Sequence, residues 1–467
     1  MTAGRDHIVT ETGAAARSLF FNPEVIIRQI LQKERTGVSV RDIICEATIF
    51  YSHTVQHPNT FRLLFRMKDT IDGNVLQLAA DQAIRRYPYY AVHCVSDGRE
   101  YLLEPHSEPF VVRHTPEPVA LGGEQSNGYL LAVSYWEDNI WVNVYHGLMD
   151  GTGALNFGRT LLYYYCRERY DPNLSAQGVR VNDGPIPQAE WENPYRQIMS
   201  GERELPDEKD ILVRVKPDAS IQPLNLLGEG RVTKSAPQYY DLRIPEQQLM
   251  QYCRSQDGTP GVVVSLLMSR AIDRLHPGNS RTIVTGMAMN LRPALGAPLY
   301  KGSPPLAIAY LPYTDRVRHK SFGPQATIYR GRLILAADHE RLLSGVKAST
   351  RLYQALDQQP TVEKKCQLAK QVVDRYHGGA TFNVSYVGPA RLAAMEPYVL
   401  ETLMQNDCND LTIEMMASHG SFFLTIVQEW KEDLYVKAFC EELTAQGIEY
   451  ELLSQGEHHV PRLTLPE

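Results

Sequence analysis

Residues 145–151 have the sequence Tyr-His-Gly-Leu-Met-Asp-Gly, in which a histidine follows an expected strand. Apolar side chains alternate from residue 140 to residue 146, so His146 shares one face with Val142 and Val144. A neutral imidazole is the best side-chain base near pH 7, since its unperturbed pKa is about 6.5. Because the histidine enters a glycine-containing loop where a substrate can reach its ring, His146 is a candidate general base.

Other interpretations of this stretch stay open from the residues alone. A lone histidine beside a turn is more often structural than catalytic. A metal site is not predicted, because His146 and Asp150 have no further His or carboxylate at ligand spacing nearby. Asp150 either orients the loop or pairs with a cation. Gly151 and Gly153 form an expected glycine-rich turn, where they permit backbone geometries that other residues resist.

Strands and helices alternate on both sides of this stretch, which predicts an α/β (α+β) fold. The apolar periodicity predicts strands at 61–65, 91–95, 129–136, 140–146, 282–291, 381–387 and 422–427. It predicts helices at 73–86, 154–169, 260–275 and 433–445.

The chain is long enough for two domains, since 467 residues exceed what one hydrophobic core usually organises. The periodicity weakens after residue 170, where prolines recur among polar residues. We therefore expect an N-terminal subdomain at 1–180, a linker or crossover at 181–235 and a C-terminal subdomain at 236–467.

Composition narrows the classes of partner. The formal net charge is −7 and no long basic run occurs, so nucleic-acid binding is not predicted. No apolar stretch approaches the ~20 residues that span a bilayer, and residues 1–18 lack the apolar core of a signal peptide. The seven cysteines form no Cys-x-x-Cys pair, which fits a reduced, cytoplasmic protein without a disulfide framework.

The pattern His146-x-x-x-Asp150-Gly151 resembles the His-His-x-x-x-Asp-Gly signature of the chloramphenicol acetyltransferase and condensation-domain superfamily. Four further stretches resemble its bacterial alcohol-acetyltransferase-like members: 85–90 (RRYPYY), 151–157 (GTGALNF), 290–293 (NLRP) and 383–388 (NVSYVG). The resemblance runs from about residue 60 to about residue 450, with its parts in the same order.

The resemblance implies two similar subdomains, each a mixed sheet with flanking helices, and an active-site tunnel between them. It implies that His146 deprotonates a hydroxyl or amine, which attacks a thioester carbonyl directly without an acyl-enzyme. Asp150 and Gly151 would hold the loop. Asp150 would pair with an arginine from elsewhere in the fold, for which Arg292 is the candidate.

Two departures from the family pattern concern the substrate contacts. Tyr145 replaces the first histidine of the signature, which leaves open any substrate contact made from that position. The plant-type Asp-Phe-Gly-Trp-Gly motif is absent. The donor that stabilises the oxyanion is unassigned between Ser385, Asn383 and a backbone amide near Gly151. For Ser385 and Asn383 the alternative is a strand residue that makes local hydrogen bonds.

The expected activity is therefore acyl transfer from acyl-CoA, as a co-substrate, to a small alcohol or amine. No tightly bound cofactor is expected. One alternative keeps the fold and changes the donor, as in a free-standing condensation enzyme that uses a carrier-protein thioester. The other alternative is a non-catalytic binding protein on the same scaffold.

Overall fold

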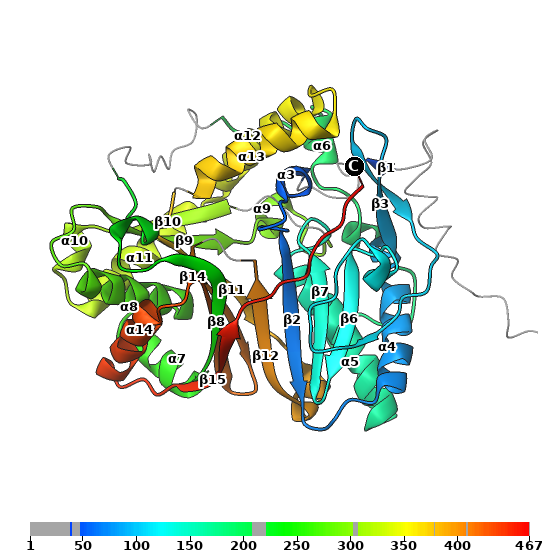
Figure 1. Ribbon diagram of the computed structural model, residues 1–467, viewed down its shortest axis with the longest axis horizontal. Coiled ribbons are helices and arrows are strands. Elements are labelled where there is room, and N and C mark those ends of the chain that lie inside the picture. The colour runs from blue at the N-terminus through cyan, green and yellow to red at the C-terminus, as the bar shows by residue number, and fades with distance from the viewer. Residues whose placement is uncertain are drawn as a thin grey trace, which may run out of the picture.

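The computed structural model describes residues 38–39, 47–207, 221–301, 307–377, 379–407 and 410–466. Two large sheets lie beside each other with helices around them (Figure 1), which confirms the expected α/β fold with two sheets and flanking helices. The expectation for residues 1–18 and part of the expected linker, residues 208–220, lie outside the described residues.

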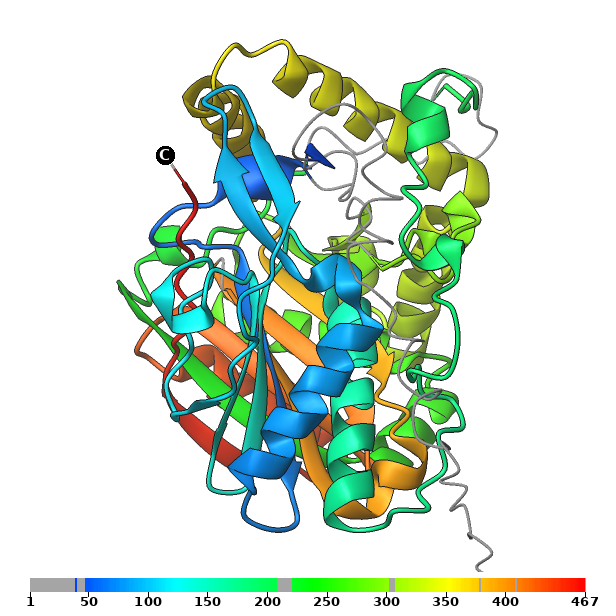
Figure 2. The same ribbon diagram turned by 90° about the vertical axis from the view of Figure 1, so that its right-hand side faces the viewer.

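The first sheet has five strands in the order β12-β2-β7-β6-β5. Its strands are β12 (Val399–Asn406), β2 (Thr60–Met67), β7 (Asn139–Tyr145), β6 (Leu131–Trp136) and β5 (Arg113–His114). All neighbours are antiparallel except β5 and β6. Helices α4 (Gly73–Arg86) and α5 (Gly151–Arg169) lie together on one face of this sheet (Figure 2).

The second sheet has seven strands in the order β10-β9-β11-β13-β14-β8-β15. They are β10 (Ala307–Tyr313), β9 (Ile283–Met289), β11 (Phe382–Pro389), β13 (Leu411–Ser418), β14 (Ser421–Trp430), β8 (Lys234–Pro245) and β15 (Glu451–Glu457). Strand β11 runs parallel to both of its neighbours, and the other pairs are antiparallel. The helices packed with this sheet are α7 (Glu246–Ser255), α8 (Pro260–Leu275), α11 (Phe322–Ala336) and α14 (Leu434–Ala445).

Most of the remaining elements lie in the upper part of the molecule in Figure 1, whereas α10 (Asp315–Arg318) lies at the left beside α11. A small sheet has the order β1-β4-β3, formed by β1 (Val38–Ser39), β4 (Tyr101–Pro105) and β3 (Val92–Ser96). The other helices are α3 (Ala47–Ser52), α6 (Arg196–Met199), α9 (Arg292–Leu295), α10 (Asp315–Arg318), α12 (His339–Asp357) and α13 (Val362–His377). Helices α12 and α13 lie across the top, and α13 packs against α3.

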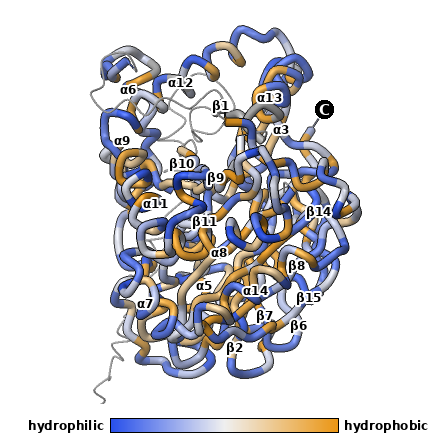
Figure 3. The backbone as a smooth tube through the Cα atoms, turned by 90° about the vertical axis from the view of Figure 1, so that its left-hand side faces the viewer, coloured by the Kyte–Doolittle hydropathy of each residue, from blue (hydrophilic) through white to orange (hydrophobic). Residues whose placement is uncertain are grey.

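Each sheet has its own hydrophobic core. One buried cluster lies between the first sheet and helices α4 and α5, and another lies between the second sheet and its helices. Figure 3 shows apolar residues concentrated on the interior strands, whereas the outer loops are mainly hydrophilic. Burial of apolar surface on one face of each sheet is therefore what holds the layers together.

The chain passes from one sheet to the other between β12 and β13. Strand β12 pairs with β2 in the first sheet, and β13 follows it directly in sequence but pairs with β11 and β14 in the second. Met395 and Met404 accordingly lie in the first hydrophobic core. The expected C-terminal subdomain thus supplies an edge strand to the sheet of the N-terminal half, and the boundaries at 180 and 235 remain a prediction.

Part of the expected linker is fixed by a buried ion pair. Glu190 accepts hydrogen bonds from both terminal nitrogens of Arg86, at 3.0 and 2.7 Å, and from the Tyr89 hydroxyl at 2.9 Å. Glu190 and Arg86 are both buried. Because one partner alone would be a costly buried charge, this contact anchors the linker to the end of α4.

The expectation of a glycine-rich turn at residues 150–153 was wrong, because residues 151–153 form the first turn of a helix. Helix α5 begins at Gly151, with Asp150 as its N-cap, and the Asp150 side chain accepts a hydrogen bond from the backbone N–H of Gly153 at 2.9 Å. Aspartate is among the best N-cap residues because it satisfies a free amide of the first turn. The cap therefore extends the helix three residues before the expected start at residue 154.

Space, and not an unusual backbone angle, explains the glycines of this turn. A Cβ atom on Gly153 would lie 2.9 Å from the backbone oxygen of Lys301, and one on Gly151 would lie 3.0 Å from Cε of Met404. Both glycines have helical geometry. The expectation that they adopt conformations that other residues resist is thus corrected to close packing against residues from distant parts of the chain.

The close contact between α5 and the first sheet predicts that a larger residue at position 158 destabilises the protein. A Cβ on Gly158 would lie 2.6 Å from Cζ of the buried Phe65 ring. We expect Gly158→Ala to lower the free energy of unfolding by about 1–3 kcal/mol, because the ring must move in a packed core. Urea denaturation followed by circular dichroism measures the change.

Gly345 is the matched control, because it is an exposed glycine inside α12, where an added Cβ would meet open space. Gly345→Ala should raise the free energy of unfolding by about 0.5–1 kcal/mol through helix propensity. Equal effects of the two substitutions would contradict the packing argument.

Candidate active site

His146 lies directly after β7, at the end of the first sheet that faces the second sheet. Its backbone N–H donates to the backbone oxygen of Asn59 at 2.8 Å, which extends the pairing of β7 with β2 by one residue. The imidazole packs edge-on against Phe61, with ring centroids 5.3 Å apart. Gly147 makes room for the turn, since a Cβ there would lie 2.6 Å from the ring of Phe50.

Tyr145 points the other way and is not a substrate contact. Its side chain is fully buried against Phe50, and its hydroxyl donates to the backbone oxygen of Ile49 at 3.0 Å. Successive side chains of a strand point to opposite faces, so His146 and its neighbour cannot share one surface. The interpretation of Tyr145 as an oxyanion or substrate residue is therefore corrected to a core residue.

A cavity of about 210 Å³ lies in front of His146, between the two sheets. Asn406 and Asp407 line it from the end of β12, and other residues line it from β9, β10, β11 and β13. The cavity therefore joins the histidine of the first sheet to the strands of the second, where the sequence led us to expect the active site.

Asn383 and Ser385 both line this cavity from β11. They alternate along the strand, and the register pairs Asn383 with Thr412 and Ser385 with Glu414 on the neighbouring β13. Thr412 and Glu414 line the cavity too. The two strands thus present a polar wall to the same space that His146 faces.

Asp150 and Arg292 form a bidentate ion pair. The two terminal nitrogens of Arg292 donate to Oδ2 and Oδ1 of Asp150, at 2.6 and 2.7 Å, and its Nε donates to the backbone oxygen of Tyr300 at 2.8 Å. Arg292 is only 3% exposed, and the Asp150 side chain is 21% exposed. Burial by itself lowers the pKa of Arg292, but the charge of Asp150 and its hydrogen bonds outweigh this and raise it.

The pair connects the two halves of the site. Asp150 caps α5 four residues after His146, and Arg292 is the first residue of α9, which follows β9. The sequence therefore identified both members, and the structure brings them together. Gly151 lies beside them as the first residue of α5.

The environment of His146 favours the neutral imidazole. Burial lowers its pKa from the ordinary value of 6.5, while the nearby charge of Asp150 and the residue's own backbone raise it by less. The ring lies deep in the protein and has partial exposure only because it faces the cavity. Its Nδ1 atom has no regular hydrogen bond to a described residue. A neutral imidazole accepts a proton, so the ring suits a general base.

Glu414 is a site residue that the sequence analysis missed. It is 3% exposed, and its Oε1 accepts a hydrogen bond from the Asn406 side chain at 3.2 Å. Burial raises its pKa to about 7, and Ser385 and Asn406 lower it by a smaller amount. No regular hydrogen bond from a described residue reaches Oε2. The available signal was a single carboxylate inside an otherwise apolar strand, residues 411–418 (LTIEMMAS).

Asn59 and Asp407 were also missed, and they support the loop of His146. Asn59 has a left-handed backbone, with φ of 55°, and its N–H donates to Oδ2 of Asp407 at 3.1 Å. His57 lies 3.5 Å from the other oxygen of Asp407, whose hydrogen bond and charge raise the pKa of His57. No local motif marks these residues, because the pairing of β2 with β12 brings them together from distant parts of the chain.

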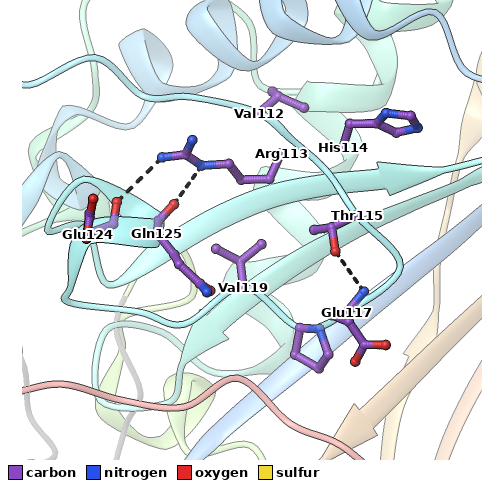
Figure 4. Close-up of a pocket in the computed structure, with 9 residues that line it drawn as sticks. Val112, Arg113, His114, Thr115, Glu117, Val119, Glu124 and Gln125 are labelled. Carbon is purple, nitrogen blue, oxygen red and sulfur yellow. Dashed lines mark hydrogen bonds between the residues drawn. The ribbon is translucent and has the colours of Figure 1, made fainter.

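A second hollow of about 720 Å³ lies beside β5 (Figure 4). Its lining residues include none of those that surround His146. Its polar groups are used within the loop itself, since Arg113 donates to the backbone oxygen of Gln125 and the N–H of Glu117 donates to Thr115. We therefore place the chemistry at His146 and not in the larger hollow.

In the described part of the chain, no three or more His, Cys, Asp or Glu side chains are grouped so that they could hold a metal ion. No helix in that part is long and apolar enough to span a membrane.

The ion pair predicts the effect of removing one charge. We expect Asp150→Asn to lower the free energy of unfolding by about 3 kcal/mol, because Arg292 would keep its charge in a buried place without a counter-ion. Activity should fall with stability, since the same carboxylate holds the loop of His146. Denaturant unfolding and the activity assay described below measure the two effects.

Asp257→Asn is the control, because Asp257 pairs with Arg330 at 2.5 Å on the surface, where the two side chains are 47% and 42% exposed. A surface pair contributes at most about 1 kcal/mol. Loss of activity in Asp150→Asn at unchanged stability would refute the structural role of Asp150.

The raised pKa of Glu414 predicts that the free energy of unfolding depends on pH. Its pKa is about 7 in the folded protein and near 4.5 when unfolded, so the folded state holds a proton between these values that the unfolded state releases. The resulting stabilisation is fully present below pH 4.5 and is lost as the pH rises through 7. Replacement by Gln removes this titration.

Between about pH 5.5 and pH 8.5 the stability of Glu414→Gln should therefore increase relative to the native protein, by up to about 2–3 kcal/mol. Glu441→Gln is the control, since Glu441 is 64% exposed. Parallel curves of melting temperature against pH for the native protein and Glu414→Gln would show that Glu414 is ionised throughout.

No protein-family model matches the sequence, and no curated protein matches it. Among solved structures, polyketide synthase associated protein 5 from Mycobacterium tuberculosis is similar with a TM-score of 0.58 and 14% identity, over 88% of this chain and 99% of that one.

Two other solved structures have a similar fold. The first condensation domain of the CDA synthetase has a TM-score of 0.57 and 14% identity, over 87% of this chain and 94% of that one. F. sporotrichioides TRI101, solved with coenzyme A and T-2, has a TM-score of 0.54 and 12% identity, over 90% of this chain and 99% of that one. At these identities the likeness shows the fold alone: the chain has the same two-sheet fold as these three solved proteins.

Proposed function

We propose that this chain is an acyltransferase that moves an acyl group from acyl-CoA to a hydroxyl or amine of a small acceptor, with His146 as the general base. The observation that carries the proposal is the position of His146, whose ring faces a cavity between the two sheets with its pKa lowered by burial. The Asp150–Arg292 pair fixes the loop that follows the ring.

The proposed reaction needs only one proton carrier. The neutral His146 accepts the proton of the acceptor hydroxyl while the oxygen attacks the carbonyl carbon of the thioester. The tetrahedral intermediate then collapses, the carbon–sulfur bond breaks, and the departing thiolate takes the proton back from His146. The products are an ester and free coenzyme A, and no acyl-enzyme forms. An amine acceptor gives an amide by the same steps.

Two effects account for the proposed rate. A base held in hydrogen-bonding reach contributes about 10²–10⁴-fold, and the lowered pKa keeps His146 neutral at pH 7. Holding both reactants in one cavity contributes through proximity. Asn383 and Ser385 stay candidates for the oxyanion donor because both line the cavity, and one such donor is worth roughly 3 kcal/mol.

Similarity to solved structures supports acyl-CoA as the donor. The structures of TRI101 contain coenzyme A, in one case with T-2 and in another with deoxynivalenol. We extend this to the present chain as a proposal: coenzyme A carries the acyl group and a small molecule accepts it. The cytoplasmic location remains a prediction from the cysteine pattern.

A second candidate function keeps the chemistry and changes the donor to a carrier-protein thioester. The likeness to a condensation domain, with a TM-score of 0.57, favours it as much as the likeness to TRI101 favours coenzyme A. The third candidate, a non-catalytic binding protein, rested on Tyr145. That residue packs in the core with its hydroxyl bonded, so its presence does not argue for a lost active site.

The proposal predicts acceptor-dependent release of free thiol from acyl-CoA. In a panel of acyl-CoA donors mixed with small alcohols and amines, His146→Ala should lower kcat by about 10²–10⁴-fold. For the native protein, kcat/KM should be retained down to about pH 6.5 and fall only at more acidic pH, because protonated imidazole is not a base and burial lowers the pKa of His146 from that ordinary value.

His276→Ala is the matched control. His276 is also buried, and its ring bonds the Tyr435 hydroxyl at 2.8 Å, outside the cavity. It should retain turnover in every sample that remains folded by circular dichroism. Thiol release that survives His146→Ala would show that His146 is not the base.

A further inference from the structure

The described residues that line the His146 cavity include two acidic side chains and no Lys or Arg. The two acids are Asp407 and Glu414. The remaining polar residues of the polar wall are neutral: Asn383, Ser385, Asn406 and Thr412. The cavity therefore offers hydrogen-bond acceptors, together with a carboxyl group that can become negative when a cation enters.

Asp407 and Glu414 differ in the hydrogen-bond partners and charges around them. Asp407 accepts a hydrogen bond from the N–H of Asn59 and lies 3.5 Å from His57, so it belongs to the support of the His146 loop. Glu414 has the Asn406 side chain on Oε1, while its buried Oε2 has no regular hydrogen bond from a described residue. Hydrogen bonding from the Ser385 and Asn406 side chains lowers the pKa of Glu414, but by less than burial raises it, so the carboxyl group is only partly compensated.

The groups on the neighbouring strands do not supply a counter-charge. Glu414 faces Ser385 on β11 and Asn406 on β12, and its register partner on β14 is Thr425. Thr425 donates to Asp241 on β8 at 2.6 Å, so the next charged group in that direction is a second acid. A buried carboxylate that lacks a cation is costly, and a ligand that brings a cation removes that cost.

We propose that Glu414 binds a protonated amino group of the acyl acceptor, separate from the hydroxyl that His146 deprotonates, so that the acceptor is a small amino alcohol. The proposal rests on the acyl transfer proposed above and names the substrate class for the same cavity. Oε2 of Glu414, which no regular hydrogen bond from a described residue reaches, receives the ammonium, and the hydroxyl end of the molecule is left for His146.

Binding of the ammonium by Glu414 also determines which end of the acceptor is acylated. An ammonium held by Glu414 has no lone pair and cannot attack a thioester, whereas the hydroxyl at the other end can. The product is therefore the O-acyl ester with a free ammonium. Glu414 acts here as a specificity residue, and its own protonation does not enter the transfer step.

The test compares acceptors that differ only at one end. Thiol release is measured at about pH 7.5, where an alkylamine is protonated, with 5-aminopentan-1-ol and with the neutral hexan-1-ol as acceptors. We expect the native protein to prefer the amino alcohol by at least about tenfold in kcat/KM. In Glu414→Gln this ratio should fall to near one, mainly through a higher KM for the amino alcohol, and mass spectrometry should identify the O-acyl product of the native protein.

Glu442→Gln is the matched control. Glu442 is a buried glutamate of α14 whose Oε2 accepts from Arg270 at 3.1 Å, outside the cavity. It should keep the native ratio, because a general loss of packing does not discriminate between the two acceptors. An unchanged ratio in Glu414→Gln, or an enzymatic N-acyl product, overturns the proposal for Glu414 while the proposed acyl transfer stands.

A binding measurement separates the two proposals if no acceptor is acylated. Calorimetry with 5-aminopentan-1-ol then reports on the cavity without turnover. Binding to the native protein that weakens at least about tenfold in Glu414→Gln supports the amine site and leaves only the acyl transfer refuted. Absence of binding to the native protein, or equal binding to both, overturns the amine site.

Discussion

A buried pair of opposite charges, Asp150 and Arg292, determines how the two sheets meet at the candidate active site. Arg292 has lost nearly all contact with water, and each of its three guanidinium nitrogens donates a hydrogen bond, two to the Asp150 carboxylate and one to the backbone oxygen of Tyr300. A guanidinium in such a place is tolerated only if its partners stay where they are. The start of α5 is therefore held against the end of β9, and the cavity of His146 has a fixed shape on that side.

Burial acts on the two titratable groups of the cavity in opposite directions. It lowers the pKa of His146 and raises the pKa of Glu414, because in each case the charged form loses solvation. Near neutral pH His146 is thus held in its neutral form as a proton acceptor, whereas Glu414 is close to its titration midpoint and can ionise fully when a cation arrives. The same physical cause, burial, therefore prepares one residue to accept a proton and the other to bind a cation.

The sequence predicted those parts of the site whose chemistry is local. His146 and Asp150 were found because a short signature contains both, and α4 was found with its correct limits because its apolar residues recur at helical spacing. The turn at 150–153 was misjudged because one capping hydrogen bond converts it into a helix start. The interpretation of Tyr145 as a substrate residue was wrong, because alternate side chains of a strand point to opposite faces and Tyr145 points into the core. The sequence alone could not predict the roles of Glu414, Asn59 and Asp407, because only strand pairing between distant segments brings them to the site.

The pairing of β12 with β2 affects how the chain folds during its synthesis. Strand β2 and the helices of the first half leave the ribosome early, but the strand that closes the outer edge of their sheet lies at residues 399–406. Until that segment has been synthesised, the nascent first sheet presents a long unpaired edge, which is a template for wrong pairing with other chains. The loop of His146 also lacks Asp407 during this time. The cavity of His146 is thus completed only after residue 407 has been synthesised, more than 250 residues later than His146 itself, and until then the edge of the first sheet needs protection from wrong pairing.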